Sequence, residues 1–204
     1  MSIQNSIGYT SVRYTTNQKQ QTCQRIIEAA GRCFRKGGYS GIGVDGLAKE
    51  AGVTSGAFYG HFSSKAEAFK AAIIAGMEDL KSGISLFQQQ HGENWWEEFA
   101  KYYMGPKRTC DLGDSCILQS VTPEVCRSEE AIRAAFESEL LKIVKLAADG
   151  TPKTTHQAAI DNAWANFAML IGGVTLARAV TDEKIANEIA TAVQQAVIAR
   201  QKST

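Results

Sequence analysis

The sequence predicts an all-α protein with about nine helices, arranged as an N-terminal three-helix module followed by a C-terminal helical bundle. Two observations carry this prediction. Apolar residues recur at the three- and four-residue spacing of helices through most of the 204-residue chain. No segment shows the strict apolar–polar alternation with turn signals that β-strands need, and the sequence contains no internal repeat.

The first third of the chain contains the shortest predicted helices. Residues 1–17 are rich in Ser, Thr, Asn and Gln, and we expect them to form a flexible arm. A helix is expected from Gln20 to the glycines of "RKGGYSG". "VDGLAKEAG" and "SGAFYGHF" predict two short helices, and "KAEAFKAAIIAGMEDL" begins a longer one that runs to about Gln90.

The rest of the chain is predicted to be helical with one irregular segment. "NWWEEFAKYYM" is an aromatic, amphipathic helix that ends before the "GP" pair. Residues 107–122 are expected to be irregular, and Pro123 is expected to open a helix that runs to about residue 148. Two final helices are expected at about 154–179 and 182–200.

The charge of the chain is distributed unevenly. Residues 1–70 contain nine Lys or Arg and four Asp or Glu, a balance of +5, whereas residues 71–204 contain thirteen and seventeen, a balance of −4. This asymmetry indicates a small module that binds a polyanion, joined to a body with another role. No apolar run approaches the roughly 20 residues that span a bilayer, and the N-terminus lacks the pattern of a signal peptide, so a cytoplasmic location and no membrane partner are expected.

A helix-turn-helix is predicted where the two short helices flank "AGVT". In such modules the second helix lies in the major groove of DNA, while flanking groups contact phosphates. We therefore expect a DNA-binding domain over residues 18–68 and a separate body over residues 69–204. The alternative is a helical hairpin without a role in DNA binding.

The segment "GVDGLAKEAGVTSGAFYGHFSSKAEAF", preceded by "RIIEAAGRCFRKGGYSG", resembles the DNA-binding domain of the tetracycline-repressor (TetR) family over about residues 23–75. The AGV turn, the F-Y-x-H-F sequence and the following S-K lie at the spacing of the family. The resemblance implies that the second helix begins at Val44 with only backbone N–H groups near a phosphate, and that two phenyl rings of the third helix pack inward. It also implies groove and phosphate contacts from Thr54, Ser55, Gly56, Ala57, Tyr59, His61 and Lys65.

The last two predicted helices are suited to dimerisation. They carry small residues that permit close helix approach and an apolar stripe, and two such helices from each subunit would form a four-helix interface around a two-fold axis. The alternative is that they pack only within their own subunit. Because one module of this size reads a short half-site, a homodimer on a palindromic operator of double-stranded DNA is expected. The candidate interface residues are Gly172, Ile185, Ile189, Val193 and Val197.

Two segments of the body, "GDSCILQSVTPEV" and "IGGVTLARAVTDEKIANEIATAV", are similar to the ligand-binding domain of one branch of the same family. In the family an inducer binds in this domain, and pockets between bundle helices combine aromatic walls with a few polar groups. An apolar or aromatic small-molecule effector is therefore expected, although core packing is the alternative for these aromatic side chains. The candidate ligand-binding residues are Phe99, Tyr103, Met104, Phe136, Trp164 and Phe167.

Five cysteines occur without a CxxC pair, and three of them fall between residues 110 and 126. The spacing of these cysteines and of the histidines does not suit a metal site, so neither a metal nor another cofactor is expected. The resemblance implies a redox- or electrophile-sensing role for Cys116, with Ser115 standing where that branch has glycine before the cysteine. Buried or incidental free thiols are the alternative.

Together these features predict a transcriptional regulator, most simply a repressor that releases its operator when an effector binds. A redox-sensing repressor that acts through Cys116 and a transcriptional activator are the alternatives. An enzyme is not expected, because the sequence has no nucleophile elbow, no glycine-rich phosphate loop and no paired catalytic carboxylates.

Overall fold

The computed structural model describes residues 16–151 and 155–202, which form ten α-helices, eight of them longer than five residues, and two 3-10 helices. The all-α prediction is confirmed for this part of the chain. The helices are α1 (Thr16–Gly37), α2 (Val44–Glu50), α3 (Ser55–Tyr59), α4 (Lys65–His91), η1 (Gly92–Asn94), α5 (Trp95–Met104), α6 (Pro106–Thr109), η2 (Leu112–Asp114), α7 (Ile117–Val125), α8 (Glu130–Asp149), α9 (His156–Ala179) and α10 (Glu183–Lys202).

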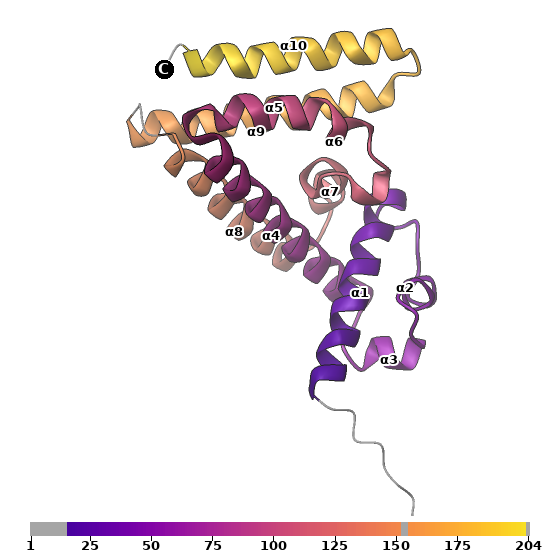
Figure 1. Cartoon of the computed structure of the whole chain (residues 1–204). Helices are drawn as coiled ribbons and strands as arrows, with labels where there is room; N and C mark the ends of the chain where they lie inside the picture. The colour runs from indigo at the N-terminus through magenta and orange to yellow at the C-terminus, as the bar shows by residue number, and fades with distance from the viewer. Residues whose placement is uncertain (1–15, 152–154, 203–204) are drawn as a thin grey trace, which may run out of the picture.

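The helices form a small N-terminal module and a larger body (Figure 1). Helices α1, α2 and α3 lie at one end of the molecule, and α4 leads from this module diagonally into the body, with α8 along its side. Helices α5, α9 and α10 pack together along the opposite edge, and α7 lies inside the angle between them and α4. Helix α1 therefore contacts the module, through α2, and also the body, through α4, η2 and α7.

The predicted flexible arm, residues 1–17, lies mostly outside the described residues. Its last two positions, Thr16 and Asn17, belong to α1, which begins four residues before the expected Gln20. The first helices otherwise occur where they were expected, although α3 ends at Tyr59.

The expectation for residues 107–122 is wrong, because α6, η2 and most of α7 lie in this segment. Pro123 does not open a helix; it lies inside α7, which ends two residues later, so its missing N–H affects only the last turn. The residues that hold α7 in place are apolar and follow helical spacing: Ile117, Leu118, Val121 and Val125 are all buried. The next helix, α8, begins only at Glu130.

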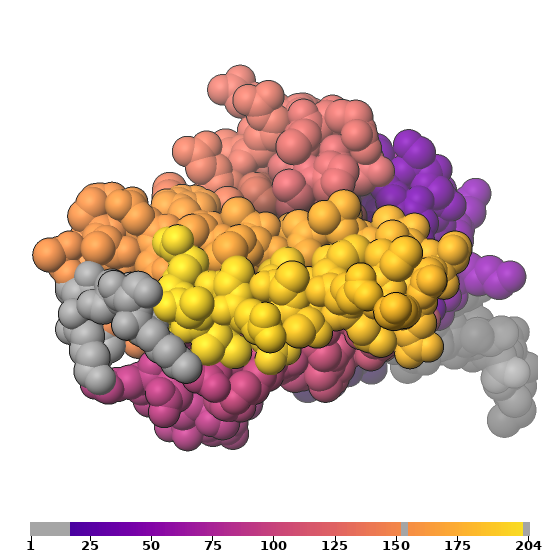
Figure 2. All heavy atoms as spheres, turned by 90° about the horizontal axis from the view of Figure 1, so that it is seen from above, coloured from indigo at the N-terminus to yellow at the C-terminus, as the bar shows by residue number. Residues whose placement is uncertain are grey.

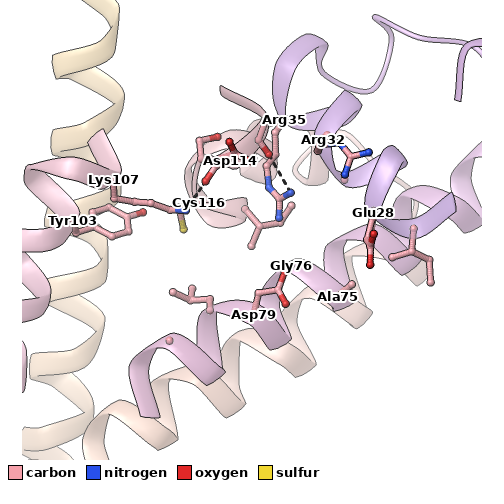
Figure 3. A pocket seen from close by; sticks show the side chains of 18 of the residues that line it. Glu28, Arg32, Arg35, Ala75, Gly76, Asp79, Tyr103, Lys107, Asp114 and Cys116 are labelled. Carbon is pink, nitrogen blue, oxygen red and sulfur yellow. Dashed lines mark hydrogen bonds between the residues drawn. The ribbon is translucent and has the colours of Figure 1, made fainter. Parts of the chain in front are cut away.

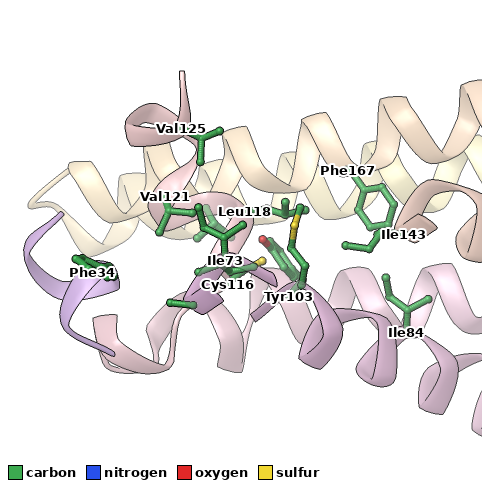
Figure 4. Close-up of a cluster of buried hydrophobic side chains, with 14 of the residues drawn as sticks. Phe34, Ile73, Ile84, Tyr103, Cys116, Leu118, Val121, Val125, Ile143 and Phe167 are labelled. Carbon is green, nitrogen blue, oxygen red and sulfur yellow. The ribbon is translucent and has the colours of Figure 1, made fainter. Parts of the chain in front are cut away.

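One continuous apolar core joins the module to the body. The rings of Phe34 of α1 and Phe69 of α4 meet edge to face, with their centroids 4.9 Å apart. Ile73 and Met77 continue the core along α4. Figure 4 shows the cluster extending from Phe34 past Ile73 to Phe167 of α9. A change in the body that moves α1 or α4 therefore reaches the N-terminal module through packed side chains.

Within the described ranges, no helix is both long and apolar enough to cross a membrane.

Candidate nucleic-acid interface and interior cleft

The turn between α2 and α3 has the geometry that the sequence predicted. Gly52 adopts a φ of +65°, a conformation that costs a residue with a side chain about 1–2 kcal/mol. The N–H of Val53 then donates to the carbonyl of Ala48 at 2.9 Å, which closes the end of α2. Phe58 is fully buried and Phe62 is 5% exposed, so both rings fix α3 against the module as expected.

The beginning of α3 is held by its own hydroxyl groups. The Thr54 side chain accepts a hydrogen bond from the N–H of Ala57 at 3.1 Å, which caps the helix. The Ser55 hydroxyl donates to a carboxylate oxygen of Asp45 at 2.6 Å, which ties α3 to α2. Gly56 is exposed, and a Cβ there would meet only Thr54 Oγ1, at 3.8 Å. This end of α3 is thus a rigid, open surface that another backbone can approach closely.

The two candidate phosphate ligands at the end of α3 differ in exposure. Tyr59 is 57% exposed, the largest exposure of any aromatic side chain in the described part of the chain. His61 is half-buried and follows the last turn of α3.

The structure gives Lys65 partners within the protein, whereas Val44 offers only its backbone, as the sequence predicted. The Lys65 ammonium donates to the carbonyls of Tyr39 at 2.9 Å and Ile42 at 3.1 Å, and it lies 4.2 Å from the centre of the Tyr39 ring. Two of its three donors therefore bind the loop between α1 and α2. The side chain of Val44 packs against the core, so only the backbone of Val44 remains for an outside partner.

The N-terminus of α4 is closed by a variant of the capping box, in which Glu67 reaches Ser63, the residue before the N-cap Ser64. Ser64 accepts from the N–H of Glu67 at 3.1 Å, and the Glu67 carboxylate accepts from the N–H and the hydroxyl of Ser63 at 2.6 and 2.7 Å. These hydrogen bonds from Ser63 lower the pKa of Glu67, which stays ionised.

A cleft of about 700 Å³, open to solvent on one side, lies between α1 and the body, beside the core that joins them. Its walls come from α1, α4, α5, α6 and the segment from η2 to the start of α7 (Figure 3). Of the candidate ligand-binding residues, Phe99 and Tyr103 line it, as does Cys116.

The other four candidate ligand-binding residues lie elsewhere. Met104 and Phe167 are at most 4% exposed and belong to the core, and Phe136 packs against that core from α8. Trp164 is 39% exposed on α9 and does not border the cleft. Helical spacing indicated that these side chains share an apolar face, but it did not indicate which helix covers that face.

The cleft is more polar than expected for an apolar effector. Its lining includes three cations and three anions, namely Arg32, Arg35, Lys107, Glu28, Asp79 and Asp114. Arg35 is the part-buried member of this set on α1: its Nε is buried without a hydrogen-bond partner, and burial lowers the pKa of its guanidinium. The hydroxyl of Tyr103 is also buried without a partner, and burial, together with the neighbouring Cys116, raises the pKa of this phenol well above its usual value.

Sequence reasoning missed Arg35. One signal was available: Ile27, Gly31 and Arg35 recur at four-residue spacing, which puts a charged side chain on a half-buried face of α1. Gly76 makes room for it on α4, because a Cβ there would lie 2.8 Å from Arg35 Nη2 and 2.9 Å from Cγ1 of Ile117.

The segment around η2 holds the last turn of α1. The Lys36 ammonium lies 3.0 Å from a carboxylate oxygen of Asp111, and Nη1 of Arg35 donates to the carbonyl of Gly113 at 3.4 Å. Because η2 leads directly into α7 and also borders the cleft, it connects the contents of the cleft with a helix of the N-terminal module.

The cysteines between residues 110 and 126 do not form one cluster. Cys116 is 7% exposed beside Tyr103, the thiol of Cys110 donates to the carbonyl of Lys107 at 3.1 Å, and Cys126 is exposed. In the described ranges, no group of three or more His, Cys, Asp or Glu side chains is placed to hold a metal ion.

Helices α9 and α10 lie side by side across one face of the molecule (Figure 2). Leu176 of α9 is 61% exposed and Ile185 of α10 is 45% exposed, and a Cβ at Gly172 would meet no atom within 4 Å. Two of the candidate interface residues point inward instead. Val197 is fully buried within its own chain, and the methyl groups of Val193 pack against Gly173.

Helices α2 and α3 form a helix-turn-helix, the motif of one large class of DNA-binding domains, and it is joined here to an all-α body. Comparison with known proteins narrows this class. Residues 26–72 match the family model described as bacterial regulatory proteins, tetR family.

Two curated relatives extend this match. The HTH-type transcriptional regulator TtgR of Pseudomonas putida is 45% identical over 62 residues, which cover 30% of each chain. The HTH-type transcriptional repressor DhaR of a Mycobacterium species is 29% identical over 121 residues, which cover 59% of this chain and 58% of DhaR. The matched segment therefore spans less than a third of TtgR and somewhat more than half of DhaR.

Solved structures match along nearly the whole chain. A TetR-family transcriptional regulator from Cytophaga hutchinsonii superposes with a TM-score of 0.71 at 19% identity, covering 89% of this chain and 96% of that one. The reduced form of E. coli NemR superposes with a TM-score of 0.70 at 17% identity, covering 85% and 95%. Residues 26–72 therefore match the tetR-family model, the chain shares the fold of these solved structures, and the curated relatives are named as a transcriptional regulator and a transcriptional repressor.

Proposed function

We propose that this protein is a transcriptional repressor that binds a palindromic operator as a homodimer and is released by a small-molecule effector. The observation that supports DNA binding most directly is the open N-terminal end of α3, where Gly56 is exposed and hydrogen bonds of Thr54 and Ser55 fix the helix. The curated relatives TtgR and DhaR are named as a transcriptional regulator and a transcriptional repressor.

In the proposed complex α3 enters the major groove. Gly56 and Ala57 approach the bases, where few hydrogen-bonding side chains are available, so methyl contacts and DNA shape carry much of the specificity. Tyr59 and His61 contact phosphates beside the groove. Lys65 acts chiefly by holding the loop before α2, and its third donor remains for a phosphate.

The proposed dimer forms through the outer face of α9 and α10. This face combines exposed Leu176, Trp164 and Ile185 with Gly172, whose open surroundings let a partner helix approach closely. Exposed apolar side chains of this size gathered on one face are typical of subunit interfaces. The two-fold axis then presents two copies of α3 about one DNA turn apart, roughly 34 Å.

In the proposed mechanism of release, the effector occupies the interior cleft. The cleft borders α1 of the DNA-binding module, and η2 links the same cleft to the last turn of α1 through Lys36 and Arg35. An effector that fits the cleft better in one orientation of α1 shifts the population toward that orientation and changes the spacing of the two α3 helices.

A gel-shift measurement with the DNA upstream of the chain's own gene tests the proposal. Gly56→Leu adds a side chain at an exposed position with open space, so the variant should fold normally but lose specific binding. Gly37→Leu is the matched control, because its Cβ also meets no atom within 4 Å and it lies at the far end of α1. Equal binding by wild type and Gly56→Leu would place the DNA contact elsewhere.

Cys116 supports a second candidate function, a repressor that responds to electrophiles. Its thiol lines the cleft, so a reactive molecule bound there would lie beside the sulfur. Cys116→Ser distinguishes the two functions: it abolishes release by an electrophile and leaves release by a non-covalent effector intact. Transcription from a reporter fused to the target promoter distinguishes a repressor from an activator.

A further inference from the structure

We infer that the interior cleft binds a small organic acid, whose carboxylate pairs with Arg35 and whose apolar body lies between α1, α4 and α5. This inference deepens the proposed function, on which it rests, by naming the chemical class of the effector. It departs from the sequence-based expectation of an apolar or aromatic effector.

Two hydrogen-bond donors in the wall of the cleft lack partners. Tyr103 is 4% exposed, and its hydroxyl is buried without a hydrogen-bond partner (Figure 3). Arg35 likewise has a buried, unpartnered Nε, and the contact of its guanidinium with the Gly113 carbonyl is long, at 3.4 Å. Because buried donors are nearly always paired in folded proteins, these two indicate a ligand that supplies acceptors.

The charges that line the cleft balance in number, and Asp79 and Asp114 act on the Arg35 guanidinium by raising its pKa against the larger effect of burial. Glu28, Asp79 and Asp114 are all exposed, so water solvates their carboxylates. Among the cations, Arg32 is exposed near Glu50, and the Lys107 ammonium donates to the backbone carbonyl of Asp114. Arg35 alone of these six is part-buried with a buried donor unused, and desolvation lowers the pKa of its guanidinium. A planar carboxylate matches the fork of donors that an arginine offers.

The apolar side chains of the cleft determine which nonpolar group the acid can carry. Ile27 of α1, Leu80 and Phe87 of α4 and Phe99 of α5 provide apolar contact. The volume of about 700 Å³ lies within the range of small-molecule sites. An acid with a medium alkyl chain or one or two aromatic rings fills this space.

Binding of the acid would compete with an existing contact. The guanidinium of Arg35 bonds the Gly113 carbonyl of the segment that holds the end of α1, and a carboxylate is a stronger acceptor than a carbonyl. The acid therefore loosens Arg35 from Gly113, which gives the two orientations of α1 different affinities for the ligand, as release of DNA requires.

The test uses the full-length protein and four acids, namely hexanoate, decanoate, phenylacetate and naphthoate, each beside its neutral primary amide. Dissociation constants are measured by calorimetry. We expect at least one acid to bind about 10-fold or more tightly than its amide, the factor of a charge-assisted hydrogen bond. Arg35→Met, which replaces a part-buried cation with an apolar side chain, should abolish this difference.

Arg32→Gln is the matched control, because it removes the same charge from the same helix at an exposed position. It should change the acid-to-amide ratio less than about 3-fold, since exposed charge pairs contribute little. Tyr103→Phe should weaken acid binding about 5-fold or more through loss of one hydrogen bond. The inference is overturned if no acid of the set binds, if acids and amides bind equally, or if Arg32→Gln acts as strongly as Arg35→Met.

Gel shifts on the same samples separate this inference from the proposed function. Specific DNA binding without any preference for acids refutes the acid class alone. Absence of specific DNA binding by the ligand-free protein refutes the proposed function, whatever the acids do.

Discussion

Replacing Tyr103 with phenylalanine should stabilise the ligand-free protein. The buried hydroxyl has no partner of good hydrogen-bond geometry and lies beside the weakly accepting Cys116 thiol, so folding removes it from water with little compensation. Leaving such a group unpaired costs about 1–3 kcal/mol, and the low end applies here because the neighbouring Cys116 thiol is a weak acceptor. Tyr103→Phe should therefore raise the free energy of unfolding by about 1 kcal/mol, or the Tm by about 2–4 °C for a chain of this size.

Thermal and urea denaturation of both proteins measure this effect. Tyr102→Phe is the control, since it is the same substitution one residue earlier on a side chain that is 39% exposed, and it should change stability by less than about 0.5 kcal/mol. Destabilisation of Tyr103→Phe by more than about 1 kcal/mol would refute the reasoning, because it would mean that the hydroxyl is already hydrogen-bonded.

Four further predictions follow from single positions. Burial raises the pKa of Tyr103 in the folded chain above its value of 10.0 when unfolded, so the free energy of unfolding should fall as the pH rises through about 10. The fall should be less steep in Tyr103→Phe, and equal slopes of unfolding free energy against pH in the two proteins would contradict this. Gly52→Ala forces a side chain to a φ of +65° and should cost about 1–2 kcal/mol, whereas Gly43→Ala, at a φ of −93°, should cost much less in the same urea titration. Lys65→Met leaves two carbonyls without their donor and should lower stability by about 1–3 kcal/mol; a change in DNA affinity alone would mean that Lys65 acts only on phosphates. Gly172→Trp should yield a folded monomer in sedimentation experiments, and a dimer of unchanged strength would exclude this face.

The helix-turn-helix could be predicted because its determinants are local. The Gly52 turn, the Thr54 cap and the inward rings of Phe58 and Phe62 all fall within about a dozen residues, where spacing along the chain fixes spacing in the structure. Tyr59 is exposed at the end of α3, and its predicted phosphate contact remains a prediction.

The cleft could not be predicted in the same way, because distant segments build it. Arg35 meets the carbonyl of Gly113, 78 residues away, and Gly76 of α4 makes room for that contact. Aromatic residues on α5, α8 and α9 all suit a bundle interior by periodicity alone. Only their packing partners decide that Phe167 enters the core and Trp164 an outer face.

The prediction that Pro123 opens a helix was wrong because it relied on a local sequence signal. A proline often begins a helix, yet this one lies near the end of α7, whose apolar residues bury against α1, α4 and α9. The energy of that burial outweighs the backbone hydrogen bond that the proline cannot make. Val197 illustrates a related ambiguity, since an apolar stripe on the last helix serves both the subunit interior and the outer face.

The central claim is that α3 reads an operator as part of a dimer. Fluorescence anisotropy with labelled DNA from upstream of the chain's own gene, compared with shuffled DNA of the same length, tests it most directly. We expect binding of two subunits per duplex, an affinity at least about 1,000-fold higher than for shuffled DNA and a steep decrease with salt, all lost in Gly56→Leu. Equal affinity for both duplexes, or unchanged binding by Gly56→Leu, would contradict the claim.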